Sequence, residues 1–550
     1  MQDEWIFYNG KIVTVDPRFT VAEAVAVRDG RIAAVGKLSA VEGQVSPRAR
    51  RVDLQGKSLI PGIVDSHNHL PFAGQIMAEG VLLFDAASIA ELQALVAAKA
   101  RELPKGTWII GAGWIENQFA EWRAPNRWDL DEAAPEHPVV LNRLFGAVAV
   151  NSRALEIAGI TAATARQYPP GTIELDPASG EPTGILRNQA QHLVRRHLPR
   201  GSAAEQQARL EKAIETAAHE YVRWGITAVI DPGVTPPVMR AYHSLYKQGR
   251  LPLRVNMMPA WFGLMALTGE EPEGLLRRVQ DFGFSSGFGD PWLNIGALKM
   301  AIDGGLGSKT AWMHAPFADG TRSTAPLRLD IERLPEYFRL GHQLGWSIGI
   351  HCCGDRAQEV AVRTFAAVIE SFPAREHRHN IIHAYFATPE TLRLMREYQL
   401  AVSAQPGFIW VEGDLYRQHL TDERLAEFTP LKTYLENGLR VACNSDMTSA
   451  FYIPFWGLHA ALTRQTARGR VLGTAERLTI REALPMFTIN GAWLAFNDAH
   501  IGSLEPGKAA DLVVLSDDIL TAAPEAVRQL RVHLTMIDGR VVYTDGALGV

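Results

Sequence analysis

Several side chains that can bind a metal ion or transfer a proton stand at the ends of short apolar runs. The run Ile63-Val64-Asp65, for example, leads directly into His67 and His69. The complete set is His67, His69, Lys299, His351, His383 and Asp446. A single histidine is more often a hydrogen-bonded structural residue than a ligand. Four histidines and an aspartate in this repeated position, however, indicate a metal site, because so much buried imidazole is hard to satisfy otherwise.

These residues need a scaffold that gathers distant segments, and the middle of the chain provides a pattern for one. Eight β-rich runs alternate with segments of helical periodicity, such as 201–224 and 356–372. The candidate strands are Leu59–Asp65, Thr227–Asp231, Arg254–Met258, Ile295–Ile302, Ser347–His351, Asn380–His383, Ala401–Gln405 and Arg440–Asn444. Eight strand–helix units predict an α/β protein built as a (β/α)8 barrel. The carboxyl ends of barrel strands share one face, so the six side chains would meet there.

The two ends of the chain have a different sequence pattern, in which runs of β-branched residues are separated by turn dipeptides. Asn9-Gly10, Asp29-Gly30 and Asp538-Gly539 each stand between such runs, which is typical of β-hairpins. Neither end is large enough for a good core of its own. We therefore expect residues 1–58 and 500–550 to form one composite β-sandwich.

The remaining residues, 59–499, would form the barrel with its metal site. About 160 residues separate its first two candidate strands, which is far more than one helix requires. This gap contains strand-like runs at 108–111 and 139–141. We expect it to be a cap of about residues 72–200, inserted after the first barrel strand.

Composition excludes several classes of protein. The 550 residues include 55 Lys plus Arg and 60 Asp plus Glu, which gives a net charge of −5. This charge, with no helix-turn-helix pattern, excludes a generally basic nucleic-acid binder. No apolar run approaches the 18 residues of a membrane span, and the acidic start lacks the features of a signal peptide. We expect a cytoplasmic protein with no membrane or nucleic-acid partner. The three cysteines do not suggest a disulfide framework, and all three are interpreted as packing residues.

Longer motifs resemble those of a known family. The run from Leu59 to His69 resembles the first-strand motif of the amidohydrolase superfamily. Gly502–Val514 resembles the segment by which the chain of these proteins returns to the β-sandwich near the C-terminus. More narrowly, the chain resembles the branch that contains N-substituted formamide deformylase and YtcJ-like proteins. The motifs that carry this likeness are Gly111-Ala112-Gly113-Trp114, Asn151–Leu155, Lys299 with Asp303–Ser308, His351-x-x-Gly354-Asp355, and Arg378-His379-x-x-x-His383-Ala384.

The resemblance implies roles for the six residues. His67 and His69 would bind one metal ion together with Asp446, and His351 and His383 would bind a second. Lys299 would lie between them as an N-carboxylated side chain, because a carbamate can bridge two cations that an ammonium would repel. An ordinary lysine and a mononuclear site remain the alternatives.

The ligand types suit zinc first, with manganese or iron as alternatives. A bound zinc ion lowers the pKa of water from about 15.7 to about 7, which would provide a metal-activated hydroxide as nucleophile. Asp446 would act as a catalytic residue that accepts the proton of this water and delivers it to the leaving nitrogen.

These features predict a metal-dependent amidohydrolase that hydrolyses a non-peptide C–N bond in a linear or cyclic amide. The alternatives are an esterase or lactonase, a decarboxylase or an isomerase on the same scaffold, or a non-catalytic binding or regulatory protein. The partner would be a small amide-like molecule, and the superfamily suggests a homodimer.

Candidate substrate-binding residues lie in the expected cap. Trp114 would either pack in the interior or line the site, where it would favour an apolar or aromatic amide. Arg143 would either form a structural salt bridge or pair with a substrate carboxylate. Asn188 replaces the acid of the family pattern. Ala147 and Ile382 also depart from that pattern, where His and Glu are usual. The departures at Ala147 and Asn188 bear on specificity for formamides.

Overall fold

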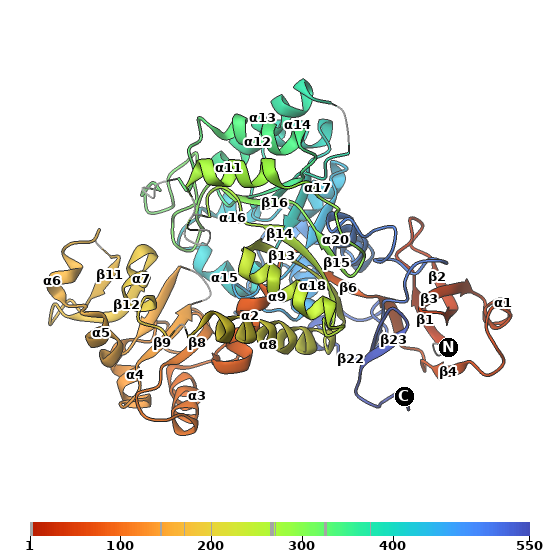
Figure 1. The fold of residues 1–550 in the computed structure, drawn as a ribbon, viewed down its shortest axis with the longest axis horizontal. Helices are drawn as coiled ribbons and strands as arrows, with labels where there is room; N and C mark the ends of the chain where they lie inside the picture. Colours follow the sequence, from red (N-terminus) through yellow and green to blue (C-terminus); the bar gives the residue numbers. More distant parts are fainter. Residues whose placement is uncertain are drawn as a thin grey trace. The chain divides into compact units, whose positions relative to one another are not determined.

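Parallel strands alternate with helices through most of the protein, which is therefore an α/β protein as predicted (Figure 1). It is described here from a computed structural model. The residues described are 4–143, 146–169, 171–199, 201–264, 269, 271–323, 327–373 and 376–550. The chain divides into two units: Met1–Leu70 with Ala218–Met447 and Phe451–Val550, and Pro71–Ala217 with Thr448–Ala450.

Two parallel sheets form the centre of the first unit. The four-stranded sheet has the order β15-β14-β13-β6, and the five-stranded sheet has the order β16-β17-β18-β19-β20. Their bounds are β6 Ile63–Asp65, β13 Ile226–Val234, β14 Arg254–Pro259, β15 Leu293–Ile295, β16 Leu298–Ala301, β17 Ile348–Cys352, β18 Asn380–His383, β19 Ala401–Ala404 and β20 Val441–Cys443. One buried apolar cluster takes residues from both sheets, including Ile230, Met258 and Ile382. The two sheets therefore share a core.

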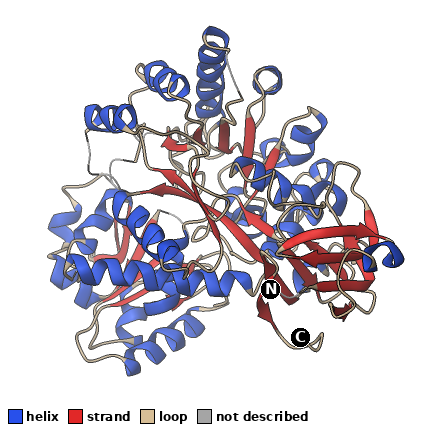
Figure 2. Cartoon of the chain, turned by 45° about the vertical axis from the view of Figure 1, so that its right-hand side comes forward, coloured by secondary structure: helices blue, strands red, loops and turns tan. Residues whose placement is uncertain are grey.

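Helices follow or separate these strands, and Figure 2 shows them in blue beside the red strands. They are α8 Ala203–Val222, α9 Pro236–Lys247, α11 Pro272–Asp281, α12 Leu334–Gln343, α13 Asp355–Ser371, α14 Pro389–Glu397, α15 Gly407–Tyr416, α16 Asp422–Ala426, α17 Leu431–Glu436, α18 Pro454–Thr463, α19 Ile480–Ala483 and α20 Ile489–Leu494. Several begin with proline at the first helical turn, where its missing N–H costs no hydrogen bond. Four short 3-10 helices are η1 Asn188–Ala190, η2 Thr474–Glu476, η3 Leu484–Phe487 and η4 Val527–Gln529.

Two of the predicted strands are interrupted, and in both cases the prediction of a single strand was wrong. Leu59–Asp65 divides at Gly62 into β5 (Ser58–Pro61) and β6, which belong to different sheets. Ile295–Ile302 likewise divides into β15 and β16 around Gly296. A Cβ at Gly62 would overlap the Thr227 side chain, and one at Gly296 would overlap Asn256. Each glycine thus lets the chain pass close to a neighbouring strand as it leaves one sheet for the other.

Strands from both ends of the chain pair in one eight-stranded sheet, seen in Figure 1 where the red and blue strands lie together. Its order is β23-β22-β21-β5-β1-β2-β3, and β4 also pairs with β1. The bounds are β1 Trp5–Val13, β2 Val21–Arg28, β3 Arg31–Gly36, β4 Arg50–Asp53, β21 Leu512–Leu515, β22 Val532–Ile537 and β23 Arg540–Thr544, with α1 at Leu38–Glu42. A buried cluster that includes Phe7, Leu59 and Val514 forms its core.

Two of the three predicted hairpin turns are confirmed. Asp29-Gly30 joins β2 to β3, and Asp538-Gly539 joins β22 to β23, with positive φ at all four residues as a two-residue turn requires. The turn predicted at Asn9-Gly10 is wrong, because β1 continues through it with a shift of register.

The second unit has its own six-stranded sheet, in the order β11-β12-β10-β9-β8-β7. The strands are β7 Val81–Leu82, β8 Ile109–Trp114, β9 Val139–Arg143, β10 Ala147–Val150, β11 Ile173–Leu175 and β12 Pro182–Arg187. The helices are α2 Leu70–Glu79, which begins at the unit boundary, α3 Ile89–Glu102, α4 Arg127–Ala133, α5 Ser152–Ala158, α6 Ala162–Ala165 and α7 Gln191–Arg195. The strands predicted at 108–111 and 139–141 correspond to β8 and β9.

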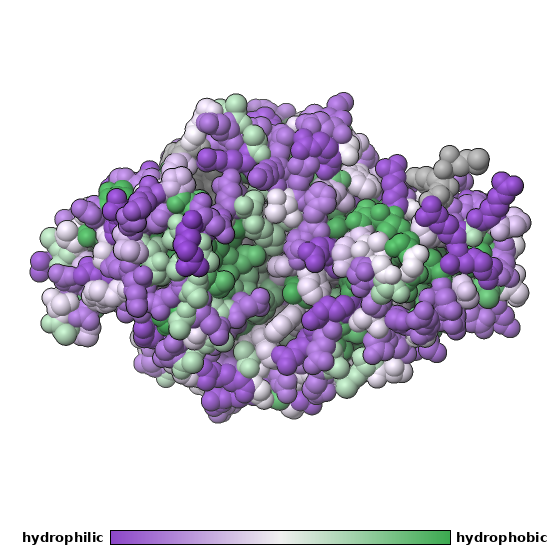
Figure 3. Space-filling view, turned by 90° about the horizontal axis from the view of Figure 1, so that it is seen from below, coloured by the Kyte–Doolittle hydropathy of each residue, from purple (hydrophilic) through white to green (hydrophobic). Residues whose placement is uncertain are grey.

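Hydrophilic residues dominate the face shown in Figure 3, with hydrophobic residues in separate patches between them. The large hydrophobic residues that are exposed include Phe288 and Val542, and some exposed apolar surface of this sort is ordinary in proteins. Among the described helices, none combines the length and the apolar composition that crossing a bilayer requires.

Candidate metal centre

The first candidate group consists of His67, His69 and Asp446, whose possible ligand atoms lie within 4.8 Å of one another. The Nε2 atoms of His67 and His69 lie 3.7 and 3.4 Å from Asp446 Oδ1. Ligands 2.0–2.2 Å from a tetrahedral zinc ion stand about 3.4 Å apart. The three side chains therefore already have nearly the spacing that such an ion requires.

Hydrogen bonds between the segments that follow β6 and β20 hold this group in place. The Asp446 N–H donates to the His67 carbonyl (2.9 Å), and the His69 N–H donates to the Met447 carbonyl (3.0 Å). Beneath them the buried Asp65 carboxylate accepts hydrogen bonds from the N–H and the hydroxyl of Ser445, at 3.0 and 2.6 Å. Burial raises the pKa of Asp65 to about 6. Asp65 is thus a positioning residue that ties the two segments together.

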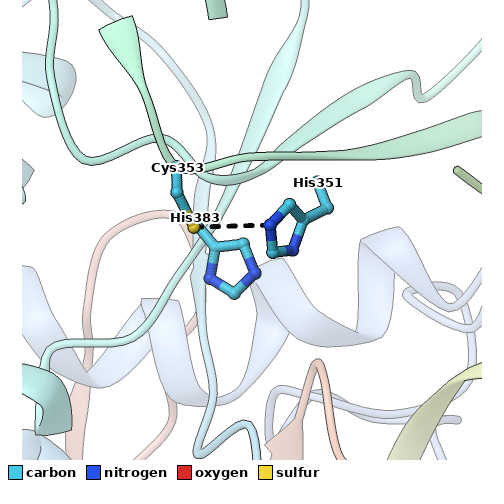
Figure 4. A group of neighbouring side chains, drawn as sticks. All are labelled: His351, Cys353 and His383. Carbon is cyan, nitrogen blue, oxygen red and sulfur yellow. Dashed lines mark hydrogen bonds between the residues drawn. The ribbon is translucent and has the colours of Figure 1, made fainter. Parts of the chain in front are cut away.

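The second candidate group consists of His351, His383 and Cys353, all buried and shown in Figure 4. The His351 and His383 rings lie 4.3 Å apart, centroid to centroid, with their planes nearly perpendicular. Cys353 Sγ lies 3.4 Å from His351 Nε2. From the sequence, Cys353 is expected to be a packing residue. It lies just beyond β17, which ends at Cys352, and its thiol is close to the two histidines.

Lys299 on β16 lies between the two groups. Its Nζ is 3.4 Å from His67 Nε2, and the His67 ring is 6.0 Å from the His383 ring, centroid to centroid. Burial lowers the pKa of Lys299 to about 7, although the nearby Asp446 carboxylate opposes this shift. The structure thus brings all six predicted side chains to one place, at the carboxyl ends of β6, β17, β18 and β20 and on β16.

The buried imidazoles are neutral near pH 7. Burial lowers the pKa of His67 and of His351 well below the ordinary value, and it lowers that of His383 to about 4. The Gln405 side-chain oxygen lies 2.8 Å from His383 Nδ1 and accepts its proton in a hydrogen bond. His383 Nε2 then keeps its lone pair. Neutral rings with a free lone pair are the form in which histidine binds metal ions.

Two of the six residues have a left-handed backbone, which is unusual for residues other than glycine. The φ angles are 76° at His383 and 47° at Asp446. Such conformations cost of order 1–3 kcal/mol each and tend to occur at functional sites.

The residues present fit a metal ion. Imidazole nitrogens, a carboxylate and a thiol converge there, and these are the ligand types that divalent transition-metal ions such as zinc take in proteins.

Comparison with known proteins agrees with this geometry. The model of the amidohydrolase family matches residues 50–543, which is most of the chain. The chain belongs to the amidohydrolase family. It is 29% identical over 558 residues to the protein named "Putative amidohydrolase YtcJ" of Bacillus subtilis (98% of this chain, 99% of that one). It is 28% identical over 544 residues to N-substituted formamide deformylase of Arthrobacter pascens (97% of each chain). The resemblance stated from the sequence is thereby confirmed.

Solved structures share the fold of this amidohydrolase. A metal-dependent hydrolase of uncharacterised activity from Pyrococcus horikoshii superposes with a TM-score of 0.72 and 24% identity, over 95% of this chain and 99% of that one. Molinate hydrolase superposes with a TM-score of 0.56 at 14% identity. Amidohydrolase family membership supports a hydrolase, and the two residue groups above are its candidate metal-binding sites.

The predicted substrate residues of this amidohydrolase belong to the second unit. Trp114 is buried, and its indole N–H donates to the Leu141 carbonyl (2.9 Å). The buried Arg143 pairs with Glu116, with Nε 2.8 Å from Oε2. Asn188 begins η1, and its side chain lies outside the part of the chain that the structure describes. Trp114 is thus engaged in packing within the second unit. Arg143 forms a structural salt bridge with Glu116.

Sequence reasoning missed the residues that support the site. Asp65, Gln405 and Asp303 touch candidate ligands or their backbone, but an isolated Asp or Gln carries no spacing signal. Asp303 could have been noticed, because it belongs to the family-like run from Lys299 to Ser308. Ile382, which replaces the usual Glu, is fully buried in the apolar cluster of the parallel sheets.

Proposed function

We propose that this amidohydrolase uses one or two divalent ions, zinc first, to hydrolyse a non-peptide C–N bond in a linear or cyclic amide. The observation that carries the proposal is the convergence of two candidate metal-binding groups around one buried lysine. One relative is named N-substituted formamide deformylase, and that name describes the relative. The likeness to it along almost the whole of both chains supports an amide as the substrate class of this protein.

Contacts between the two parallel sheets support a closed barrel. We propose that residues 59–499, apart from the β5 residues that pair in the sheet of the two chain ends, form a (β/α)8 barrel with a cap of about residues 72–200, and that residues 1–58 and 500–550 form the β-sandwich with β5. In support of closure, a parallel bridge joins Ala260 to Lys299 between the two sheets, and the Ser66 hydroxyl donates to the Cys443 carbonyl between β6 and β20 (3.0 Å).

Each residue would have a definite part. His67, His69 and Asp446 would hold one ion, His351 and His383 the other, and Lys299 would bridge them as a carbamate. A bound divalent ion would supply Lewis acidity, polarising the substrate carbonyl and making water more acidic. Asp446 would take a proton from the attacking water and return it to the leaving nitrogen. The lowered pKa of Lys299 supports its modification, because only the neutral amine can attack carbon dioxide.

One experiment tests the proposed function. Purified protein is assayed for metal content, for hydrolysis of a panel of N-substituted formamides, cyclic amides and lactones, and for decarboxylation of carboxylic acids. We expect at least one amide to be hydrolysed, the activity to disappear with a chelator, and zinc to restore it. The Lys299→Ala variant should retain fewer ions per chain than wild type.

Other results would contradict the proposal in distinct ways. Hydrolysis of lactones alone would indicate an esterase or lactonase on the same scaffold. A protein that binds no divalent ion and hydrolyses nothing would indicate a binding or regulatory protein. Full metal content in Lys299→Ala would contradict the proposal that Lys299 binds the ions as a carbamate.

Gln405 offers a more specific prediction about the second group. Replacing Gln405 with leucine removes the acceptor that fixes the tautomer of His383, so retention of metal should weaken about 10–100-fold. Competition with a chelator measures the change. The exposed Gln418, replaced in the same way, is the matched control. Equal affinity in both variants would show that the Gln405–His383 hydrogen bond has no part in metal binding.

A further inference from the structure

The thiol of Cys353 points toward the two histidines of the second group (Figure 4). Cys353 Sγ, His351 and His383 each offer one atom, and these atoms lie within 4.8 Å of one another. Cys353 and His383 are each 1% exposed, and His351 is 7% exposed. The neighbouring Cys352 is equally buried but is absent from this group.

The surrounding backbone fixes the position of this thiol. The Asp303 carboxylate accepts hydrogen bonds from the N–H groups of Cys353 (3.0 Å) and Gly354 (2.8 Å). It also accepts one from the Trp312 N–H (2.8 Å). Gly354 lies against the Trp312 carbonyl so closely that a Cβ would overlap it. The segment after β17 therefore has little freedom to turn the thiol elsewhere.

The spacing agrees with coordination of a common ion. A sulfur 2.3 Å and a nitrogen 2.0 Å from a tetrahedral zinc ion stand about 3.5 Å apart. The observed distance from Cys353 Sγ to His351 Nε2 is 3.4 Å. The same Nε2 lies 3.2 Å from the Gly304 carbonyl oxygen, to which it donates while it is protonated. A thiol hydrogen bond to His351 gives a similar distance, so the experiment must separate the two roles.

We propose that Cys353 is a third protein ligand of the second metal ion, together with His351 and His383. This inference rests on the proposed function, since it requires an ion at that group. On binding, the thiol loses its proton to solvent, and a sulfur electron pair forms the bond to the ion, with no change of oxidation state. A thiolate beside two imidazoles favours a soft or borderline ion such as zinc over manganese or magnesium.

Cobalt(II) is the probe, because thiolate coordination gives it a charge-transfer absorption in the near ultraviolet. The full-length protein is stripped of metal and titrated with cobalt, as wild type, Cys353→Ser and the matched control Cys352→Ser. We expect the band in wild type and in Cys352→Ser, and its loss in Cys353→Ser. Affinity for the ion at this group should fall at least about tenfold in Cys353→Ser, while cobalt still binds at His67, His69 and Asp446.

The wild-type protein alone also gives a decisive measurement, so a variant that fails to fold does not weaken the test. X-ray absorption of the zinc-loaded protein should show a sulfur scatterer about 2.3 Å from zinc. Two ions per chain with no sulfur contact and no charge-transfer band would overturn the role of Cys353 and leave the proposed function intact. A band that persists in Cys353→Ser would also overturn it. If no variant binds any ion, both proposals fail.

Discussion

Replacing Asp446 with asparagine is expected to lower turnover about 10²–10⁴-fold, the range that loss of a general base and acid produces. Asparagine keeps an oxygen that can face His67 and His69, so the metal content should change little. What it loses is the ability to take a proton from water and to pass it to the leaving nitrogen. The measurement is the turnover number on the amide that the substrate panel identifies, with metal content determined on the same sample.

The control for this prediction is the exposed Asp422, whose change to asparagine alters the charge equally but lies far outside the group. Turnover near the wild-type value in Asp446→Asn would refute the assigned role. A loss of activity matched by an equal loss of metal would indicate that Asp446 acts only as a ligand.

The largest expected effect on stability is that of Asp511→Asn. The Arg254 guanidinium at the start of β14 forms two hydrogen bonds with the Asp511 carboxylate, at 2.7 and 2.9 Å, and both side chains are almost fully buried. Asp511 also accepts a hydrogen bond from the Asp538 N–H (2.9 Å). Removing the carboxylate charge leaves the buried guanidinium with the more distant and exposed Asp538 (3.7 Å) in place of its buried partner, and breaking a buried pair in this way costs about 3–5 kcal/mol.

Urea unfolding followed by intrinsic fluorescence measures this loss. The matched control is Glu397→Gln, which breaks the exposed ion pair with Arg393 and should cost less than about 1 kcal/mol. Because well-packed apolar residues can replace a buried pair, Arg254→Met combined with Asp511→Leu should recover much of the stability. Asp511→Asn as stable as wild type would contradict the importance of the pair.

Turn dipeptides illustrate how far local sequence determines the fold. Asp29-Gly30 and Asp538-Gly539 make the predicted turns, with positive φ at both residues of each pair. At Asn9-Gly10 a parallel neighbour changes the outcome: the Lys11 N–H donates to the Lys57 carbonyl, and Gly10 packs against that backbone. Gly10 lets two backbone segments of the same chain approach closely. Its partner is almost 50 residues away along the sequence, so no local pattern could reveal this contact.

The candidate site shows the same division. His67, Lys299 and Asp446 could be predicted because Lys299 lies on a regular strand and the other two follow closely after the ends of β6 and β20, where the strand fixes their position in space. Cys353 could not, since its direction depends on three backbone N–H groups that meet the Asp303 carboxylate. Gln405 contacts His383 from the next strand, and only the tertiary structure shows this contact.

The pairing of β5 with β21 has a consequence for how the protein is made. Leu59 pairs with Val514, so β5 cannot gain its partner until more than 450 further residues have been synthesised. At about 5–20 residues per second, a ribosome needs roughly 25–90 seconds for this length. During that interval the nascent N-terminal strands expose a bare hydrogen-bonding edge to other chains, which makes chaperone supply and translation rate decisive for the yield of soluble product.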